Sequence, residues 1–256
     1  LGPYSFQPSE ALKLTFILYG AAWLASRTKK GAATFLPFGM VVALIAALLL
    51  LQPDLSTLGV IGASGLVMYF VSGTPFWHTL LLMGGGAAAL LLFLITSPYR
   101  MNRLLVFLNP SLDPLGRGYQ IKQALIGIGS GGLTGVGLGL SFQKFGFLPE
   151  PISDSIFAIV AEELGLLGAS FLILLFLAFA WRSFILAKRI EDPFSRIATL
   201  GIASWITLQA FVNMGSITGL LPLTGIPLPF ISYGGSALAM ELLAMGILLK
   251  LTGQKS

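Results

Sequence analysis

The 256-residue sequence contains no cysteine and a single histidine, His78. Without cysteine the chain forms neither disulfides nor thiolate metal sites. One histidine excludes a histidine-rich metal centre and disfavours a histidine-based nucleophilic relay. Charged residues are also scarce, at 10% of the chain against ~25% in soluble domains. The basic residues do not alternate with aromatic residues in a patch, so the net charge of +5 does not indicate nucleic-acid binding.

Apolar residues dominate instead: 55% of the chain is hydrophobic and the mean hydropathy is +0.89. This composition is typical of a polytopic membrane protein. A helix that crosses a bilayer needs ~20 mostly apolar residues. We therefore predict an all-α polytopic membrane protein, with a single integral-membrane domain over residues 1–256. The seven candidate spans are Ser9–Ser26, Phe35–Leu51, Leu55–Val71, Phe76–Thr96, Asp154–Trp181, Ile197–Val212 and Ser236–Leu251.

The segment between the fourth and fifth candidate spans, residues 97–153, carries charges and many glycines but no clean span. Lys and Arg gather in the short connections on one side of the predicted spans, and the positive-inside rule places that side in the cytoplasm. These residues are Arg27, Lys29, Lys30, Arg182, Lys188, Arg189, Arg196, Lys250 and Lys255. Residues 97–153 are therefore predicted to form a long extracytoplasmic loop, which ends at Asp154 on the outer face of the membrane.

Asp154 stands at the start of a strongly apolar helix, directly after a proline-rich loop. A carboxylate at a helix N-terminus is stabilised by free backbone N–H groups and by the helix dipole, which favour its ionised form. An ionised carboxylate at a membrane surface can act as a general base toward a sugar hydroxyl. The competing interpretation is an ordinary N-cap, a role open to Ser153 or Asp154.

Glu162 and Glu163 lie two turns into the same helix, where ionisable groups are costly and often functional. At 100° per residue, Glu162 is turned about 80° from Asp154 and Glu163 about 180°. Glu162 is therefore the expected partner of Asp154 in one cavity. A buried structural pair with Lys or Arg explains either glutamate equally well.

Three charged residues mark the predicted outer ends of other spans. Glu10 and Lys13 have the i,i+3 spacing of a helical ion pair, which is sufficient to fix helix packing. Lys13 also lies at the predicted membrane depth of Asp154, where a cation could meet a lipid pyrophosphate. Asp54 is a further carboxylate predicted on the outer face.

The long loop contains two features that suit phosphate. Arg100, Arg103 and Lys144 are candidate phosphate contacts, with solvated loop residues as the alternative. The glycine run, residues 127–139 (GIGSGGLTGVGLG), follows no predicted strand and does not end in Gly-Lys-Ser/Thr, so a Walker loop is poorly supported. Flexible or re-entrant backbone that lines a cavity is the better interpretation of this run.

Motifs along nearly the whole chain resemble the SEDS family (shape, elongation, division and sporulation). A SEDS protein has ten helices, so the resemblance implies three more before Leu1, in keeping with a sequence that does not begin with Met. The Ser-Asp-Ser form at Asp154 is closer to the division branch of the family. In chain order the motifs are QPSEALK (Gln7–Lys13), QPDLST (Gln52–Thr57), FLNPSLDPLGRGYQ ending at Gln120, IGSGGLTGVGLG, QKFGFLPEPISDSIFAIVAEELG from Gln143, and TGIPLPFISYGG (Thr224–Gly235).

The resemblance implies a peptidoglycan glycosyltransferase that polymerises lipid II by inverting transfer at the outer face of the bacterial cytoplasmic membrane, in cell division or cell-shape maintenance. Asp154 matches the family's essential aspartate. Phe142, Ile152, Ser153 and Ser155 depart from the residues common in the family. Other motif positions are Glu10, Lys13, Asp54, Arg100, Gln143, Lys144, Pro149, Glu150 and Glu162. The residues expected to contact the pyrophosphate or the sugar are Lys13, Arg100, Arg103, Gln143, Lys144 and Glu150, and those expected to be supporting charges of the cavity are Glu10, Asp54 and Glu162.

The expected mechanism also predicts partners. The pyrophosphate leaving group needs positive charge, either from basic side chains or from a divalent cation such as Mg²⁺ or Mn²⁺, whose protein ligands are not assigned. The resemblance implies a class B penicillin-binding protein, which is a transpeptidase, as partner, together with other division or elongation membrane proteins.

Two other functions fit the same residues. A lipid II flippase would use Glu10, Glu162 and Glu163 along a polar path through the membrane, and Asp154 alone would matter little to it. A structural subunit that activates a transpeptidase would tolerate charge changes at Asp154. Polymer made from lipid II distinguishes the enzyme from both alternatives.

Overall fold

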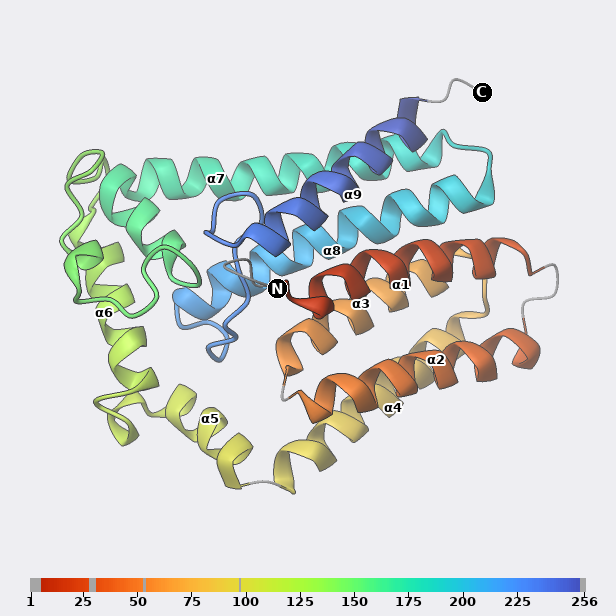
Figure 1. Ribbon diagram of the computed structural model, residues 1–256, viewed down its shortest axis with the longest axis horizontal. Helices are drawn as coiled ribbons and strands as arrows, with labels where there is room; N and C mark the ends of the chain where they lie inside the picture. The colour runs from red at the N-terminus through yellow and green to blue at the C-terminus, as the bar shows by residue number, and fades with distance from the viewer. Residues whose placement is uncertain (1–5, 28–30, 53, 97, 254–256) are drawn as a thin grey trace. The chain divides into compact units, whose positions relative to one another are not determined.

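The computed structural model describes residues 6–27, 31–52, 54–96 and 98–253, which fold into helices joined by loops and contain no β-strand (Figure 1). The helices are α1 (Pro8–Ala25), α2 (Ala32–Leu51), α3 (Leu55–Val71), α4 (Phe76–Ile95), α5 (Pro98–Leu108), α6 (Arg117–Ser130), α7 (Ile156–Lys188), α8 (Pro193–Ile217) and α9 (Gly235–Gly253), with 3-10 turns η1 (Pro110–Leu112) and η2 (Gln143–Phe145).

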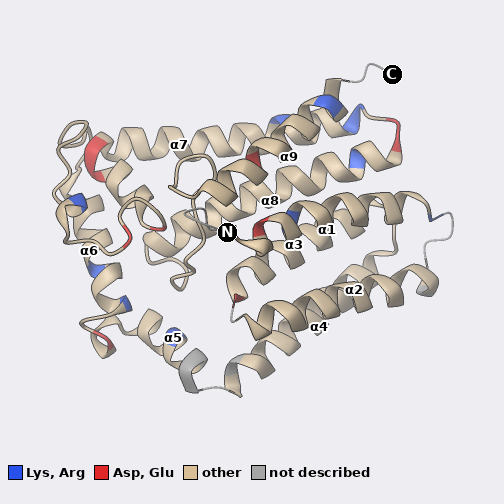
Figure 2. Cartoon of the chain, viewed as in Figure 1, with Lys and Arg blue, Asp and Glu red and all other residues tan. Residues whose placement is uncertain are grey.

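Each of the seven candidate spans corresponds to a helix. Within the described residues, five helices are long and apolar enough to cross a membrane: α2, α4, α7, α8 and α9. The apolar helix α3 is shorter, at 17 residues, and α1 carries Glu10 and Lys13. Figure 2 shows α2 and α4 without a charged residue. The all-helical prediction is confirmed, and the count of seven spans stays a prediction.

The chain divides into two compact units, the first of which comprises residues 1–89, 178–208 and 235–256. In this unit α3 packs against α1 and α2, and α1 packs against α9. The ring of Phe38 from α2 lies 4.9 Å from the Tyr69 ring of α3 and 6.5 Å from the Phe16 ring of α1. Gly65 permits this approach, because a Cβ there would lie 3.0 Å from the Phe16 ring.

The second unit comprises residues 90–177 and 209–234. It includes the segment predicted as a long loop, which contains α5, η1, α6 and η2. The carboxylate of Asp113 accepts hydrogen bonds from the backbone N–H groups of Gly116 (3.0 Å) and Arg117 (2.9 Å). These bonds satisfy N–H groups that a helix N-terminus leaves open and fix the first turn of α6.

Helix α7 is interrupted at Gly165, whose φ of 66° and ψ of −167° are accessible in practice only to glycine. The interruption leaves some backbone groups of α7 without hydrogen-bond partners in the helix. The glycine run provides those partners. Four hydrogen bonds of 2.9–3.1 Å join the two segments: Val136 N to Glu162 O, Gly137 N to Glu163 O, Leu166 N to Gly132 O, and Leu167 N to Leu133 O. The glycine run is thus backbone packed against α7.

Candidate active site

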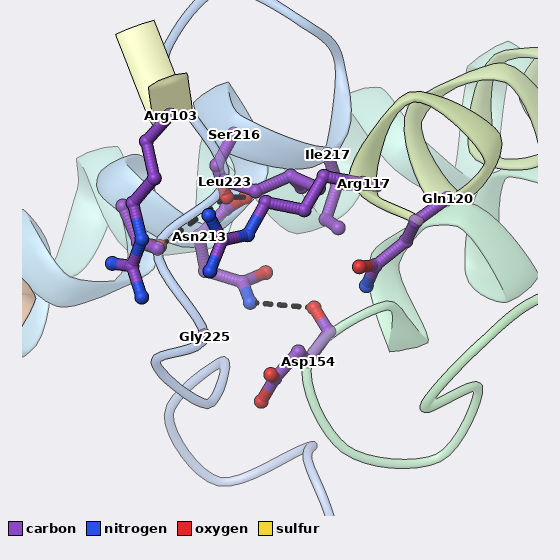
Figure 3. A pocket seen from close by; sticks show the side chains of 10 residues that line it. Arg103, Arg117, Gln120, Asp154, Asn213, Ser216, Ile217, Leu223 and Gly225 are labelled. Atoms are coloured by element: carbon purple, nitrogen blue, oxygen red, sulfur yellow. Dashed lines mark hydrogen bonds between the residues drawn. The ribbon is translucent and has the colours of Figure 1, made fainter. Parts of the chain in front are cut away.

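The second unit contains a cavity of about 210 Å³ that holds the carboxylate of Asp154 (Figure 3). This volume lies below the ~300–1,000 Å³ of pockets that enclose whole small molecules, so it suits a reacting centre better than an entire saccharide. The lining combines two arginines, one carboxylate and several polar groups: Arg103, Arg117, Gln120, Asp154, Asn213, Ser216, Ile217, Leu223, Thr224 and Gly225.

Three hydrogen bonds to backbone carbonyls hold the residues around Asp154 in place. The amide of Asn213, on α8, donates to Asp154 O (2.8 Å; dashed in Figure 3) and to Ile226 O (2.8 Å). The Ser232 hydroxyl donates to Ser153 O (2.6 Å). Since Asn213 is 1% exposed, its amide joins α8, the Asp154 turn and the 218–234 loop in a dry environment, where a hydrogen bond is strongest.

The side chain of Asp154 does not act as an N-cap of α7, which was the competing interpretation of this residue. Among the described residues it accepts its hydrogen bond from the Ser153 hydroxyl (3.1 Å) and not from a backbone N–H of α7. Burial raises the pKa of Asp154 above its ordinary value, the Ser153 hydrogen bond lowers this pKa, and the nearby charge of Glu150 raises it. Burial of the side chain therefore opposes the stabilisation of the ionised form that the helix N-terminus is predicted to give.

The two arginines reach the cavity from different helices. Arg103 comes from α5 and Arg117 from the first turn of α6, three residues before Gln120. The i,i+3 spacing places Arg117 and Gln120 on one face of α6. The Gln120 amide also donates to the Ser155 hydroxyl (3.0 Å), which in turn donates to Pro149 O (3.0 Å), so α6 is tied to the Asp154 turn.

Glu162 does not line this cavity, although it is buried in the same unit. Its carboxylate accepts hydrogen bonds from the Ser141 hydroxyl and from the backbone N–H groups of Phe142 (3.2 Å) and Gln143 (3.4 Å). Glu163 forms an ion pair with Lys144 (2.9 Å). Both glutamates of α7 therefore hold the segment that follows the glycine run.

The other candidates from the long loop lie outside the cavity lining. Lys144 donates to Glu163 and to Gly139 O, and Gln143 is buried at 6% exposure. Glu150 is exposed and has a φ of 47°, a left-handed conformation that costs energy in a residue other than glycine. The side chain of Arg100 lies outside the described residues.

Glu10, Lys13 and Asp54 belong to the first unit. Lys13 Nζ lies 2.7 Å from Glu10 Oε2, and both side chains are nearly fully buried. Lys13 also lies over the Trp205 ring, 5.1 Å from its centre. Asp54 is the N-cap of α3, where its carboxylate accepts a hydrogen bond from Thr57 N (3.0 Å).

Sequence reasoning missed Arg117, Gln120 and Asn213 as cavity residues. Arg117 and Gln120 lie within the FLNPSLDPLGRGYQ motif. Their i,i+3 spacing, which places two residues on one face of a helix, was the signal that could have found them. Asn213 lies one residue beyond the predicted span Ile197–Val212 and within α8, which continues to Ile217, and a polar amide at the end of an apolar run is itself a signal. Glu241, a buried carboxylate in α9, was also overlooked.

A divalent cation does not fit the cavity as a protein-bound metal. No group of three or more His, Cys, Asp or Glu side chains that could hold a metal occurs in the described part of the chain. Asp154 is the one carboxylate of the ten lining residues, and Arg103 and Arg117 share the cavity with it. The expected Mg²⁺ or Mn²⁺ stays a prediction.

Apolar spanning helices and a half-buried carboxylate beside two arginines define a multi-pass membrane protein with an acidic residue in a polar cavity. A family profile described as "Cell cycle protein" (FtsW, RodA, SpoVE) matches residues 1–256. The chain therefore belongs to the FtsW/RodA/SpoVE family, as the sequence motifs predicted.

Curated relatives cover nearly all of the chain. Stage V sporulation protein E of Bacillus subtilis is 42% identical over 98% of the chain and 70% of its own length. A probable peptidoglycan glycosyltransferase FtsW of Idiomarina loihiensis is 40% identical over 100% of the chain and 64% of its length. A probable FtsW of Thioalkalivibrio sulfidiphilus is 44% identical over 98% and 64%. The chain thus spans 64 to 70% of the length of these relatives.

Solved structures share the fold. A chain from a peptidoglycan synthase complex, described as coordinating polymerization and crosslinking, matches with a TM-score of 0.77 at 31% identity, over 100% of this chain and 73% of that one. The rod shape determining protein RodA of Thermus thermophilus matches with a TM-score of 0.70 at 29% identity, over 100% and 69%.

Proposed function

We propose that this chain forms the catalytic part of a peptidoglycan glycosyltransferase that polymerises lipid II, with Asp154 as the general base. The observation that carries the proposal is the cavity in which Asp154, its pKa raised by burial, lies with Arg103 and Arg117. A base is most effective when its pKa approaches the working pH, and an aspartate of ordinary pKa is a weak one. Curated relatives named peptidoglycan glycosyltransferase support the class of enzyme.

The proposed reaction is a single displacement. The carboxylate of Asp154 takes the proton from the 4-hydroxyl of the acceptor sugar as that oxygen attacks the anomeric carbon of the donor. The bond from the anomeric carbon to the lipid pyrophosphate breaks, and its electron pair leaves with the pyrophosphate. An α-linked donor gives a β-linked product by inversion, so no covalent intermediate with the protein is required.

The leaving pyrophosphate develops negative charge, which Arg103 and Arg117 are placed to stabilise. Guanidinium groups suit phosphate oxygens because their donors form a planar fork. Fixed positive charge at the developing anion is usually a large contribution to catalysis. We therefore propose that the pyrophosphate binds on the arginine side of the cavity and the sugar hydroxyl beside Asp154.

We further propose that the reaction takes place at the outer face of the cytoplasmic membrane, beside a class B penicillin-binding protein. The charge distribution of the short connections supports the orientation. The likeness to a chain of a peptidoglycan synthase complex supports a transpeptidase partner. Lys13 and Glu10 are proposed to support the membrane fold of the first unit, since they pair with each other.

The proposed function is tested with the full-length protein and its transpeptidase partner, purified in detergent and incubated with lipid II. Glycan chains resolved on a gel are the expected result. Detergent micelles have no second compartment, so transport of lipid II across a membrane cannot contribute to this result, and polymer is direct evidence of glycosyl transfer. Movement of lipid II across vesicle membranes by a preparation that makes no polymer would instead establish the flippase.

The environment of Asp154 predicts opposite pH shifts for two neighbouring substitutions. The base must be deprotonated, so activity falls as the pH drops through the pKa of Asp154, which lies above its ordinary value. Glu150→Gln removes a like charge and lowers that pKa, so the acidic limb moves to lower pH. Ser153→Ala removes the hydrogen bond that favours the carboxylate, so the limb moves to higher pH.

Initial polymerisation rates across the acidic range, measured for wild type and both variants, test this prediction. Glu191, an exposed glutamate in the α7–α8 turn, provides the control, because Glu191→Gln is expected to leave the limb in place. Shifts of the same sign in Glu150→Gln and Ser153→Ala would show that Asp154 does not set the limb.

Asn213 is predicted to act on the rate by positioning Asp154. Asn213→Ala removes the donors to Asp154 O and Ile226 O, so the turn that carries the carboxylate loses its fixed position. Small displacements of a reacting group cost up to ~10²-fold in rate. We expect kcat to fall by about that factor with little change in KM, as measured by steady-state polymerisation.

Gln209→Ala is the matched control for Asn213→Ala. Gln209 lies one turn earlier on α8, donates to Pro227 O (3.1 Å) in the same loop, and is not among the residues that line the Asp154 cavity. Equal losses of kcat in the two variants would mean that Asn213 supports the fold in general and does not position Asp154.

A further inference from the structure

The segment that follows the glycine run has its polar side chains inside and its apolar side chains outside. Ser141 and Gln143 are buried, whereas Leu140 before them and Phe142 between them are exposed, Phe142 at 71%. Phe145 is exposed to the same extent, and Leu138 and Phe147 are exposed as well. We call residues 138–147 the aromatic loop. A loop in water shows the reverse pattern, so this one is built for apolar surroundings.

The aromatic loop is held rigidly in this orientation. Glu162 binds Ser141 and the backbone of the next two residues, and Glu163 accepts from Ser141 N (3.4 Å) and pairs with Lys144. These contacts bind the Ser141 hydroxyl, the Lys144 ammonium and backbone N–H groups of the loop to α7. The exposed phenylalanines are therefore fixed in place and do not collapse into the protein to escape water.

The depth of the loop follows from the length of α7. At 1.5 Å per residue, ~20 residues cross the hydrocarbon layer. Counted back from Trp181, which is a typical interface residue, this distance ends near Glu162. Counted back from Lys188, the basic end of α7, it ends near residue 169. The count from Trp181 thus places the outer boundary of the hydrocarbon at Glu162 and Glu163, to which the loop is bonded, and the count from Lys188 places it ~2 helical turns further along α7.

We propose that the aromatic loop contacts the outer lipid surface directly, with Phe142 and Phe145 inserted at the boundary of headgroups and acyl chains. Aromatic side chains concentrate at this depth in membrane proteins. Residues 97–153 carry more Lys and Arg than Asp and Glu, which favours anionic lipid. The contact anchors the outer segment beside Asp154 to the membrane in which a lipid-linked substrate would travel. The proposal does not depend on the proposed reaction.

The absence of cysteine from the chain makes the depth measurable with single spin labels. The full-length protein, without other cysteines, carries Phe142→Cys, Phe145→Cys or Leu138→Cys and is reconstituted in vesicles of phosphatidylethanolamine and phosphatidylglycerol. Collision rates with oxygen, which enters lipid, and with a water-soluble nickel complex then report depth. Labels at Leu174, exposed on α7, and at Glu191 in the α7–α8 turn give the lipid and aqueous references.

We expect the oxygen-to-nickel collision ratio at Phe142 and Phe145 to exceed that at Glu191 several-fold and to approach the value at Leu174. Ratios equal to the Glu191 reference would overturn the proposal, since the loop would then face water. If neither oxygen nor the nickel complex reaches the labels, the loop is covered by protein, and this result would also overturn the proposal. If the oxygen-to-nickel ratio of the protein without its partner equals the Glu191 reference and changes after the transpeptidase is added, the loop binds the transpeptidase and the proposal is overturned.

Discussion

Replacing Asp154 with asparagine is expected to remove lipid II polymerisation, with a rate loss of about 10²–10⁴-fold, the range typical of a general base. Asparagine keeps the size of the side chain and can still accept the Ser153 hydrogen bond, but it cannot take a proton at neutral pH. The Asn213 bond goes to the backbone carbonyl of residue 154, so the turn is expected to remain in place. Single-turnover polymerisation by the full-length complex measures the effect.

Asp192→Asn is the control for Asp154→Asn. Asp192 also precedes a helix, but it caps α8 by accepting from Ser195 N (2.8 Å) and from the Ser195 hydroxyl. These hydrogen bonds lower the pKa of Asp192, the opposite of the direction at Asp154. Asparagine is an effective N-cap, so activity should be unchanged. A folded Asp154→Asn protein with normal rates would remove Asp154 from the reaction.

The second large effect is expected from Gly135→Ala. Gly135 has a φ of 81°, and a Cβ there would clash with the carbonyl of Glu163. The left-handed backbone alone costs roughly 1–2 kcal/mol for alanine, and each hydrogen bond lost between the glycine run and α7 adds about 1 kcal/mol. We expect the free energy of unfolding to fall by more than about 3 kcal/mol, measured by thermal unfolding in detergent.

Gly129→Ala is the control for Gly135→Ala, because it shows whether replacing any glycine of the run by alanine lowers the stability. Gly129 lies inside α6, and a Cβ there would meet no atom within 4 Å. Alanine is favoured over glycine in a helix by up to ~1 kcal/mol, so this substitution should leave stability unchanged or raise it. A Gly135→Ala protein as stable as Gly129→Ala would contradict the packed arrangement of the run.

Apolar composition made the helical class and the approximate span positions predictable. A bilayer leaves few alternatives for long uncharged runs, and α3 begins and ends at the predicted residues Leu55 and Val71. The motifs around Asp154 sufficed to predict the family, which the comparisons confirm. The start of α7 at Ile156, two residues beyond Asp154, lies within the usual uncertainty of helix ends.

Contacts between distant segments were not predictable from local pattern. Glu162 shows the reason: its helical angle indicated the side of Asp154, yet its partners come from residues 141–143, and no periodicity pairs those residues with α7. The helix α6 was not predicted, because its glycines are more typical of loops than of helices. The raised pKa of Asp154 depends on burial by the 218–234 loop and α8, which sequence spacing does not reveal.

The interruption of α7 at Gly165 also governs the direction in which the aspartate points. Hydrocarbon offers no donors or acceptors to the open backbone groups, so α7 without the glycine run would close its own ladder across residue 165 and straighten. Straightening would swing the preceding turns about the new axis and carry residue 154 away from the two arginines. The glycine run, which has no reactive side chain, therefore sets the direction of the Asp154 carboxylate in another segment of the chain.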